Sequence, residues 1–197
     1  PPKVAPIQVV IVPIYYTDED EKKVLEKADE IENTLAKQGL RVHVDRRSQL
    51  TPGFKFHDWE LRGIPLRVEL GPKDIAKQKV VLVKRHSRQK TDVPLDKLEN
   101  EVVSVLDTIQ KELFEAAKKL LSQMTLKVSD YEQFKSKIED GGFFEAPWCG
   151  NQKCEEKIKE ETGADIRVIP FDSKNSDGKC IFCKSQSVSN VILARGY

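Results

Sequence analysis

The chain has 197 residues, 39% of them hydrophobic, which suits one large or two small globular domains with a buried core. Its 33 basic and 32 acidic residues give a net charge of +1, which excludes a global basic field for nucleic acid. Apolar runs such as residues 9–14 and 80–83 are far shorter than the roughly 18 residues of a membrane-spanning helix. No secretory signal opens the sequence. We therefore expect a soluble cytoplasmic protein without a membrane partner.

Short β-branched runs alternate with helical patterns over the first 90 residues. Strands are expected at residues 7–14, 40–44, 65–70 and 80–84. One helix is expected from Thr17 to Gly39, and a shorter one over residues 53–61 that Gly63 ends. Apolar strands that can be buried on both faces, alternating with helices, predict an α/β sandwich around a mostly parallel or mixed sheet.

The longest helical pattern starts at Pro94 and carries an apolar stripe from Leu95 to Leu120. Beyond it the sequence changes character, with a short helix expected near residues 131–138, a double-glycine break, and an apolar run over residues 143–148. We place a domain boundary near residue 125, so the predicted domains are residues 1–124 and 125–197. The second is too small to form a stable core easily on its own.

Four cysteines in two close pairs form the strongest local signal, Cys149-x4-Cys154 and Cys180-x2-Cys183. Two such pairs about 25 residues apart suit a tetrahedral zinc site made of four thiolates. The alternatives are two disulfides, which require an oxidising compartment, or four unrelated thiols. A zinc ion with four protein ligands has no vacancy for water or substrate, so the role expected for it is structural.

Catalytic motifs are missing from the sequence. It contains no phosphate-binding Gly-x4-Gly-Lys-Ser/Thr loop, no His-Glu-x-x-His helix and no Gly-x-Ser-x-Gly turn. The three histidines, His43, His57 and His86, are scattered, and no nearby Ser or Cys forms an obvious nucleophile pair with them. These residues predict a binding module rather than an enzyme.

Charge is unevenly distributed along the chain. Residues 73–90 contain seven Lys and Arg against one acid, Asp74, whereas residues 18–32 contain eight acids and three lysines. A basic edge of this kind can bind a polyanion backbone. The alternative is a solvated strand end and loop.

A longer motif precedes this basic segment. The short helix expected over residues 53–61, which contains Trp59 and Glu60, is followed by Gly63-Ile64-Pro65 and by a strand reading Arg67-Val68-Glu69-Leu70-Gly71-Pro72. This run resembles the anticodon-binding domain shared by several class II aminoacyl-tRNA synthetases. With the four-cysteine module and the ending Arg195-Gly196-Tyr197, nearly the whole chain resembles the prolyl-tRNA synthetases of the eukaryotic and archaeal type.

The resemblance implies a mixed five-stranded sheet flanked by helices, followed by a small zinc-binding α+β domain. It implies recognition of the two guanines that proline anticodons share. The residues implied for this are Glu60, Arg67, Lys73 and Lys90. A carboxylate such as that of Glu60 can accept the N1–H and N2–H2 donors of an unstacked guanine, while the cations donate to O6, N7 or phosphate. Lys90 is expected in a loop.

Structural alternatives remain open for these residues. Glu60 can be an ordinary helix carboxylate paired with Arg62 or Lys55. Arg67 can form a strand-face ion pair with Glu69 or Glu60.

Aromatic side chains near the motif have two possible roles. Phe54, Phe56 and Trp59 can stack on unpaired bases, but the helical spacing of Phe56 and Trp59 favours core packing. Asp45 and Arg46 are expected to orient the loop or to contact the backbone.

The resemblance also implies partners and cofactors. The parent enzyme activates proline with ATP and transfers it to tRNA(Pro) as a homodimer, so the expected partners are the anticodon loop and the enzyme's own catalytic domain. ATP and magnesium belong to that upstream domain, whose motifs are absent, so we expect the segment alone to be inactive. Tyr197 resembles the family ending that folds back toward the catalytic domain. The rival functions are a free-standing paralogue acting as an interaction or regulatory subunit, and a zinc-dependent or redox enzyme.

Overall fold

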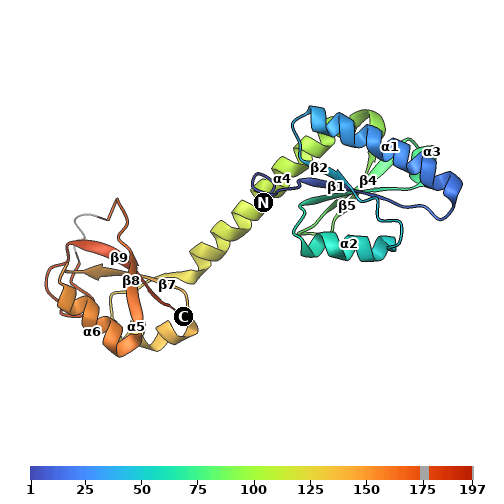
Figure 1. Cartoon of the computed structure of the whole chain (residues 1–197). Coiled ribbons are helices and arrows are strands. Elements are labelled where there is room, and N and C mark those ends of the chain that lie inside the picture. The colour runs from blue at the N-terminus through green and yellow to red at the C-terminus, as the bar shows by residue number, and fades with distance from the viewer. Residues whose placement is uncertain (174–177, 197) are drawn as a thin grey trace. The chain divides into compact units, whose positions relative to one another are not determined.

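The computed structural model describes residues 1–173 and 178–196 (Figure 1). The chain divides into two compact units, residues 1–115 and 116–197. Helix α4 (Leu98–Met124) begins in the first unit and ends in the second. The domain boundary near residue 125 stays a sequence-based prediction. Within the described ranges, no helix combines the length and the apolarity needed to cross a membrane.

The first unit follows the expected alternation of strands and helices. In chain order it contains β1 (Val9–Pro13), α1 (Asp18–Lys37), β2 (Val42–Val44), α2 (Pro52–Leu61), β3 (Leu66–Leu70), α3 (Pro72–Ala76), β4 (Lys79–Lys84), β5 (Lys90–Pro94), the 3-10 helix η1 (Leu95–Lys97) and the start of α4. Side-chain caps begin both major helices of the N-terminal half. The Thr17 hydroxyl accepts from the Asp20 amide at α1, and the Thr51 hydroxyl accepts from the Phe54 amide at α2.

The five strands form one mixed sheet in the order β2-β1-β3-β4-β5. β1 is parallel to both β2 and β3, whereas β4 and β5 continue the sheet as an antiparallel meander. The predicted mixed five-stranded α/β fold is therefore confirmed. The crossovers of the parallel strands contain the long helices α1 and α2, whereas the antiparallel strands are joined by shorter connections, of which the one between β3 and β4 contains α3.

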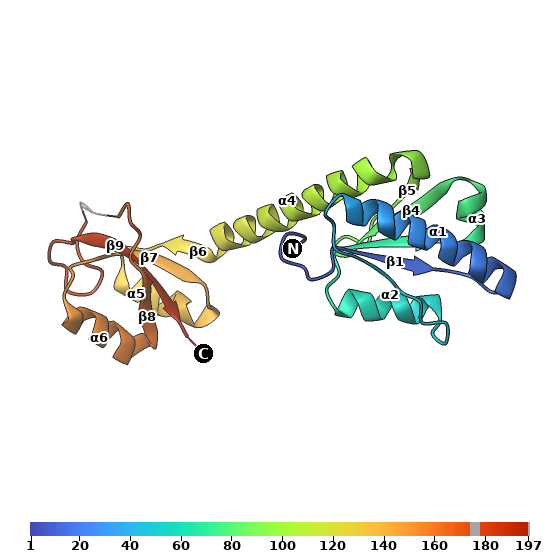
Figure 2. The same cartoon turned by 45° about the horizontal axis from the view of Figure 1, so that its top comes forward.

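Helices cover both faces of this sheet. Figures 1 and 2 show α1 on one face and α2 on the other. The larger core joins α1 and α4 to alternate strand residues such as Ile11, Val68 and Leu82. The smaller core, on the α2 face, contains Val10 and Val12. Burial on both faces explains why β1 reads as a continuous apolar run.

One sequence expectation about the sheet is wrong. Lys90 lies not in a loop but at the start of β5, where Val83 of β4 is its pairing partner. Val93 is the one buried residue of β5, so this edge strand has no apolar alternation by which the sequence could indicate it.

In its described residues, the second unit contains the end of α4, a four-stranded sheet and two further α-helices. Its elements are β6 (Thr125–Lys127), α5 (Tyr131–Lys137), the 3-10 helix η2 (Ile138–Asp140), β7 (Phe143–Trp148), α6 (Gln152–Thr162), β8 (Ala164–Val168) and β9 (Ser189–Arg195). The strand order is β6-β7-β9-β8, and β9 is antiparallel to both of its neighbours. In its core Phe134 and Phe144 make an edge-to-face contact with ring centroids 5.3 Å apart.

Candidate nucleic-acid interface and metal centre

Strand geometry gathers charged side chains on the α2 face of the first sheet. Side chains alternate along β3, so Arg67 and Glu69 both face α2, while Val68 between them enters the larger core. Arg67 pairs with Val83 on β4, and Val83 pairs with Lys90 on β5. Arg67 and Lys90 therefore lie on the same face, two strands apart.

Five charged residues form what we call the Arg67 cluster: Glu60, Arg67, Glu69, Arg88 and Lys90. Arg67 Nη1 donates to Glu60 Oε1 at 3.3 Å, and its Nε and Nη2 donate to Glu69 Oε1 at 3.1 and 3.0 Å. Lys90 Nζ donates to Glu69 Oε2 at 3.0 Å. Arg88 Nη2 lies 3.7 Å from Glu60 Oε2. Three cations thus surround two carboxylates.

Exposure increases from the floor of the Arg67 cluster to its rim. The side chains of Arg67 and Glu69 are each 9% exposed, whereas that of Glu60 is 22% exposed. The Lys90 side chain at the rim is 59% exposed. A ligand that approaches this face therefore meets Glu60, Arg88 and Lys90 before it meets Glu69.

The ion-pair alternatives for this cluster are partly correct. Arg67 pairs with Glu60 and Glu69, as the alternative for Arg67 stated. Glu60 does not pair with Arg62, which instead donates to Asp58 at 3.2 Å.

Lys73 lies apart from the Arg67 cluster. It is exposed in the first turn of α3, beyond the carboxyl end of β3. Within residues 1–173 and 178–196, its ammonium forms no ion pair and no hydrogen bond. The structure therefore brings Glu60, Arg67 and Lys90 together and leaves Lys73 as a separate cation.

The three aromatic residues of α2 have different surroundings. The Phe56 ring lies under the Arg67 guanidinium, 4.2 Å from the ring centroid to Cζ. Trp59 is buried in the smaller core, so the predicted core packing of Phe56 and Trp59 is confirmed. Phe54, by contrast, is 55% exposed.

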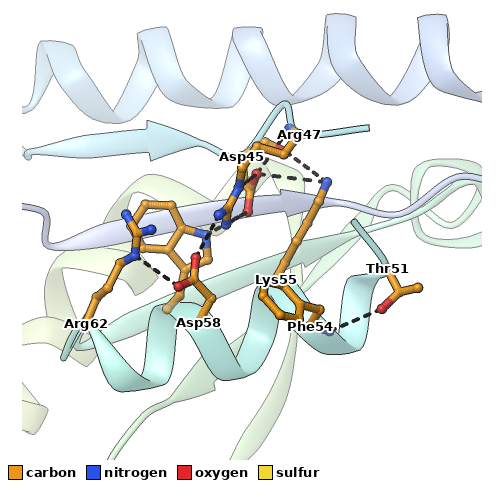
Figure 3. A network of polar contacts seen from close by, with 8 residues as sticks. Asp45, Arg47, Thr51, Phe54, Lys55, Asp58 and Arg62 are labelled. Carbon is orange, nitrogen blue, oxygen red and sulfur yellow. Dashed lines mark hydrogen bonds and ion pairs between the residues drawn. The ribbon is translucent and has the colours of Figure 1, made fainter. Parts of the chain in front are cut away.

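A buried polar network fixes α2 to the end of β2. The carboxylate of Asp45 is 1% exposed and accepts from Trp59 Nε1 at 2.8 Å and from Arg47 Nε and Nη2 at 2.9 and 2.7 Å. Lys55 Nζ donates to the Asp45 carbonyl at 3.2 Å. Figure 3 shows Lys55 and Asp58 extending from α2 toward Asp45 and Arg47. The helix that carries Glu60 is thus fixed by buried charge and hydrogen bonds.

The pKa of Asp45 reflects these contacts. Burial acts to raise it, but hydrogen bonds from Arg47 and Trp59 outweigh burial and lower the pKa from 3.8 to about 2. Burial also lowers the pKa of Lys55, although the nearby Asp45 opposes this shift. Asp45 therefore remains ionised in the folded protein at neutral pH.

Much of the basic segment over residues 73–90 is neutralised by acids. Lys79 pairs with Asp92, and Lys84 and His86 both bind the Glu112 carboxylate, at 3.1 and 2.8 Å. The lysine-rich sequence thus presents fewer free cations than its composition indicates.

The four cysteines converge in the second unit. Cys149 follows β7, and Cys154 lies in the first turn of α6. Cys180 and Cys183 lie in a tight turn in which the Cys180 amide donates to the Ser185 carbonyl at 2.8 Å. The turn is tied to β7 because the Ile181 amide donates to a β7 carbonyl, also at 2.8 Å.

The sulfur atoms have the spacing of a tetrahedral site. All four lie within 4.8 Å of one another, and Cys149 Sγ is 3.6 Å from Cys154 Sγ and 3.7 Å from Cys183 Sγ. Zinc–sulfur bonds of about 2.3 Å in a tetrahedron place the sulfurs about 3.8 Å apart. The cysteines are free thiols, not disulfides. These residues therefore fit a four-coordinate metal ion.

The thiols differ in acidity. Burial raises the pKa of Cys154 and of Cys180. The Ser185 hydroxyl, 2.9 Å from Cys183 Sγ, lowers the pKa of Cys183 to about 6. Because a metal requires thiolates, it would have to displace protons from the two buried cysteines.

Comparison with known families gives one match in each of the two units. Residues 8–105 match the family described as anticodon binding domain, and residues 131–197 match the family described as prolyl-tRNA synthetase, C-terminal. The first unit is therefore an anticodon-binding domain of an aminoacyl-tRNA synthetase.

Curated relatives narrow this assignment. The chain is 48% identical over 197 residues to a proline–tRNA ligase of Cenarchaeum symbiosum and 44% identical over 197 residues to that of Oceanobacillus iheyensis. It is 41% identical over 198 residues to proline–tRNA ligase 2 of Clostridioides difficile. All of this chain is covered each time, but only 41, 40 and 40% of the respective relative. The chain belongs to the prolyl-tRNA synthetase family and spans about 40% of the length of these relatives.

Tyr197, which the resemblance associates with the catalytic domain, lies outside the described residues.

Proposed function

We propose that this chain binds the anticodon loop of a proline tRNA and that the Arg67 cluster recognises its guanines. The observation that carries the proposal is the position of the Glu60 carboxylate, which lies half-buried between two guanidinium groups, those of Arg67 and Arg88. This arrangement offers acceptors and donors side by side. A guanine edge needs both, because N1–H and N2–H2 donate while O6 and N7 accept.

Glu60 is the carboxylate best placed to exchange partners. Its contacts to Arg67, Arg88 and His57 are 3.3, 3.7 and 3.9 Å long, at or beyond the long end of hydrogen-bond distances. Donors from a guanine can therefore replace them at small cost. Arg67, Arg88 and Lys90 would then donate to O6, N7 or an adjacent phosphate.

Lys73 and Phe54 extend the proposed surface beyond the cluster. The unpaired ammonium of Lys73 suits a phosphate or the O6 atom of the second guanine. The exposed ring of Phe54, at the start of α2, suits stacking on an unpaired base.

The cysteine cluster is proposed as a structural zinc site. Cys149, Cys154, Cys180 and Cys183 would supply four thiolates, and the ion would stabilise a unit whose hydrophobic core is small. With four protein ligands the site has no position for substrate.

For the longer protein, we propose the activity that the relatives' names state, ligation of proline to tRNA. ATP and magnesium would bind the part of such a protein that this chain does not include, so residues 1–197 alone are expected to be inactive. A homodimer in the cytoplasm is the proposed state, with the catalytic domain of the same polypeptide as a partner.

The test is binding of this chain to a proline-type anticodon stem-loop at fixed moderate salt, beside loops with either guanine replaced by adenine. Each replacement is expected to lose about 1–3 kcal/mol, because adenine offers neither an N1–H donor to Glu60 nor an O6 acceptor to the cations. In Glu60→Ala, replacing at least one of the two guanines by adenine is expected to leave the binding free energy unchanged.

Glu26→Ala is the matched control, since it removes one carboxylate from the exposed surface of α1. It is expected to keep the discrimination. Equal binding of the wild-type chain to all loops would contradict the proposal and favour a nonspecific phosphate surface or a regulatory subunit.

A further inference from the structure

Glu69 is the most enclosed carboxylate of the Arg67 cluster and contacts two of its cations. Its Oε1 accepts from Arg67 Nε and Nη2 at 3.1 and 3.0 Å and from Lys90 Nζ at 3.3 Å. Its Oε2 accepts from Lys90 Nζ at 3.0 Å. These contacts occupy both oxygens, and the side chain is 9% exposed, so Glu69 is poorly placed to bind a base directly.

The Arg67 guanidinium is fixed from three directions. Glu69 binds its Nε–Nη2 edge, Glu60 contacts Nη1 at 3.3 Å, and the Phe56 ring lies against its face. The Glu69 contacts are the shorter ones. Arg67 is therefore bound chiefly by Glu69, and its contact with Glu60 is secondary.

Removing the Glu69 charge would change this balance. Among the described residues, Glu60 would be the one carboxylate still paired with Arg67, and guanidinium groups favour bidentate pairing with carboxylates. Both Glu60 oxygens would then be occupied by Arg67. Lys90 would lose its partner and become a free cation at the rim.

We propose that Glu69 is a positioning residue of the guanine site. By binding the inner edge of Arg67 and the ammonium of Lys90, it keeps the Glu60 carboxylate available to the N1–H and N2–H2 donors of guanine. This inference rests on the proposed function, recognition of guanine by Glu60.

The inference predicts opposite changes in specificity and in general affinity. Glu69→Gln leaves three cations against one carboxylate in the cluster, so attraction to phosphate rises. At the same time discrimination between guanine and adenine falls, because Glu60 is engaged by Arg67. A merely structural role predicts that binding to every loop falls together.

The experiment measures the ratio of affinities for the guanine and adenine stem-loops with wild-type chain, Glu69→Gln and Asp92→Asn. Asp92 lies on β5 and pairs with Lys79, so its neutralisation changes the local charge equally but leaves the cluster intact. The wild-type ratio is expected to be about 5- to 150-fold. It should persist in Asp92→Asn and fall below about threefold in Glu69→Gln, whose affinity for the adenine loops is unchanged or higher.

The outcomes separate the inference from the function on which it rests. A wild-type ratio near one overturns both. A wild-type ratio that survives in Glu69→Gln, or a uniform loss of binding to all loops in that variant, overturns the role of Glu69 alone. Should Glu69→Gln not fold, Glu69→Asp keeps the charge but shortens its reach. A reduced ratio with unchanged binding to the adenine loops then supports the inference, and an unchanged ratio overturns it.

Discussion

Replacing Asp45 by alanine is expected to destabilise the anticodon-binding domain strongly. The change leaves the indole N–H of Trp59 buried without an acceptor, at about 1–3 kcal/mol. It also leaves the 3%-exposed ammonium of Lys55, 4.0 Å from Asp45 Oδ1, without its nearest counter-charge. Breaking a buried ion pair costs about 3–5 kcal/mol, so we expect a loss of that size. A domain is typically stable by only about 5–15 kcal/mol.

Urea unfolding followed by Trp59 fluorescence measures this loss. The chain has two tryptophans, so a Trp148→Phe background leaves Trp59 as the single reporter. Asp29→Ala is the control, because it breaks a half-exposed ion pair with Arg46 and is expected to lose less than about 1 kcal/mol. If Asp45→Ala were no more destabilising than Asp29→Ala, the reasoning from buried charge would be refuted.

The same carboxylate predicts how stability depends on acid. Its folded-state pKa of about 2 lies below the ordinary 3.8, so the unfolded chain takes up a proton first as pH falls. The stabilisation is fully present above about pH 4 and disappears as pH falls through about 2. Between about pH 4 and 2, the free energy of unfolding of Asp45→Asn should therefore fall less than that of the wild-type chain.

Three further predictions concern other sites. Chelation of zinc, or Cys180→Ser, is expected to lower the melting temperature of residues 116–197, and metal analysis should give one zinc per chain; unchanged melting would contradict a structural metal. Gly142→Ala should lower the free energy of unfolding by more than Gly141→Ala, because both have positive φ but only at Gly142 would a Cβ lie 2.7 Å from the Met124 carbonyl oxygen; equal losses would show that φ alone decides. Phe54→Ala should weaken binding to all stem-loops by about 1–3 kcal/mol with unchanged stability; unchanged affinity would exclude stacking there.

The sequence allowed most of the first sheet to be predicted, since its strands are apolar and bounded by clear signals. Thr17 and Gly39 lie at the two ends of α1, and Gly63 follows the end of α2, as the sequence indicated. β5 was not predicted, because this edge strand has one buried residue and so lacks the apolar alternation by which a strand is recognised. β9 was not predicted either, although its Val191 and Leu193 are buried in the core of the second unit.

The candidate sites were predictable to different degrees. The spacing of the four cysteines was enough to predict one cluster, because two close pairs are typical of a four-thiolate metal site, and the four sulfur atoms do lie within 4.8 Å of one another. For the Arg67 cluster, the period of a strand places Glu69 beside Arg67, and the sequence analysis named Glu69 as a possible partner. Arg88 was not predicted as a site residue, because it approaches Glu60 from a turn in which Arg88 itself has a φ of 57°, and the sequence does not indicate this conformation.

The contacts of the Arg67 cluster join residues that are close to one another in the sequence. Arg67 is seven residues from Glu60 and two from Glu69, and Lys90 is 21 residues from Glu69, whereas the parallel pairing of β1 joins Val9 to Leu66. On the proposed function, the side chains that contact the bases therefore lie mostly within residues 60–90, from the end of α2 to the start of β5. Exchange of this single stretch between related domains should transfer preference for a base while the long-range core stays intact, so specificity and folding can change independently.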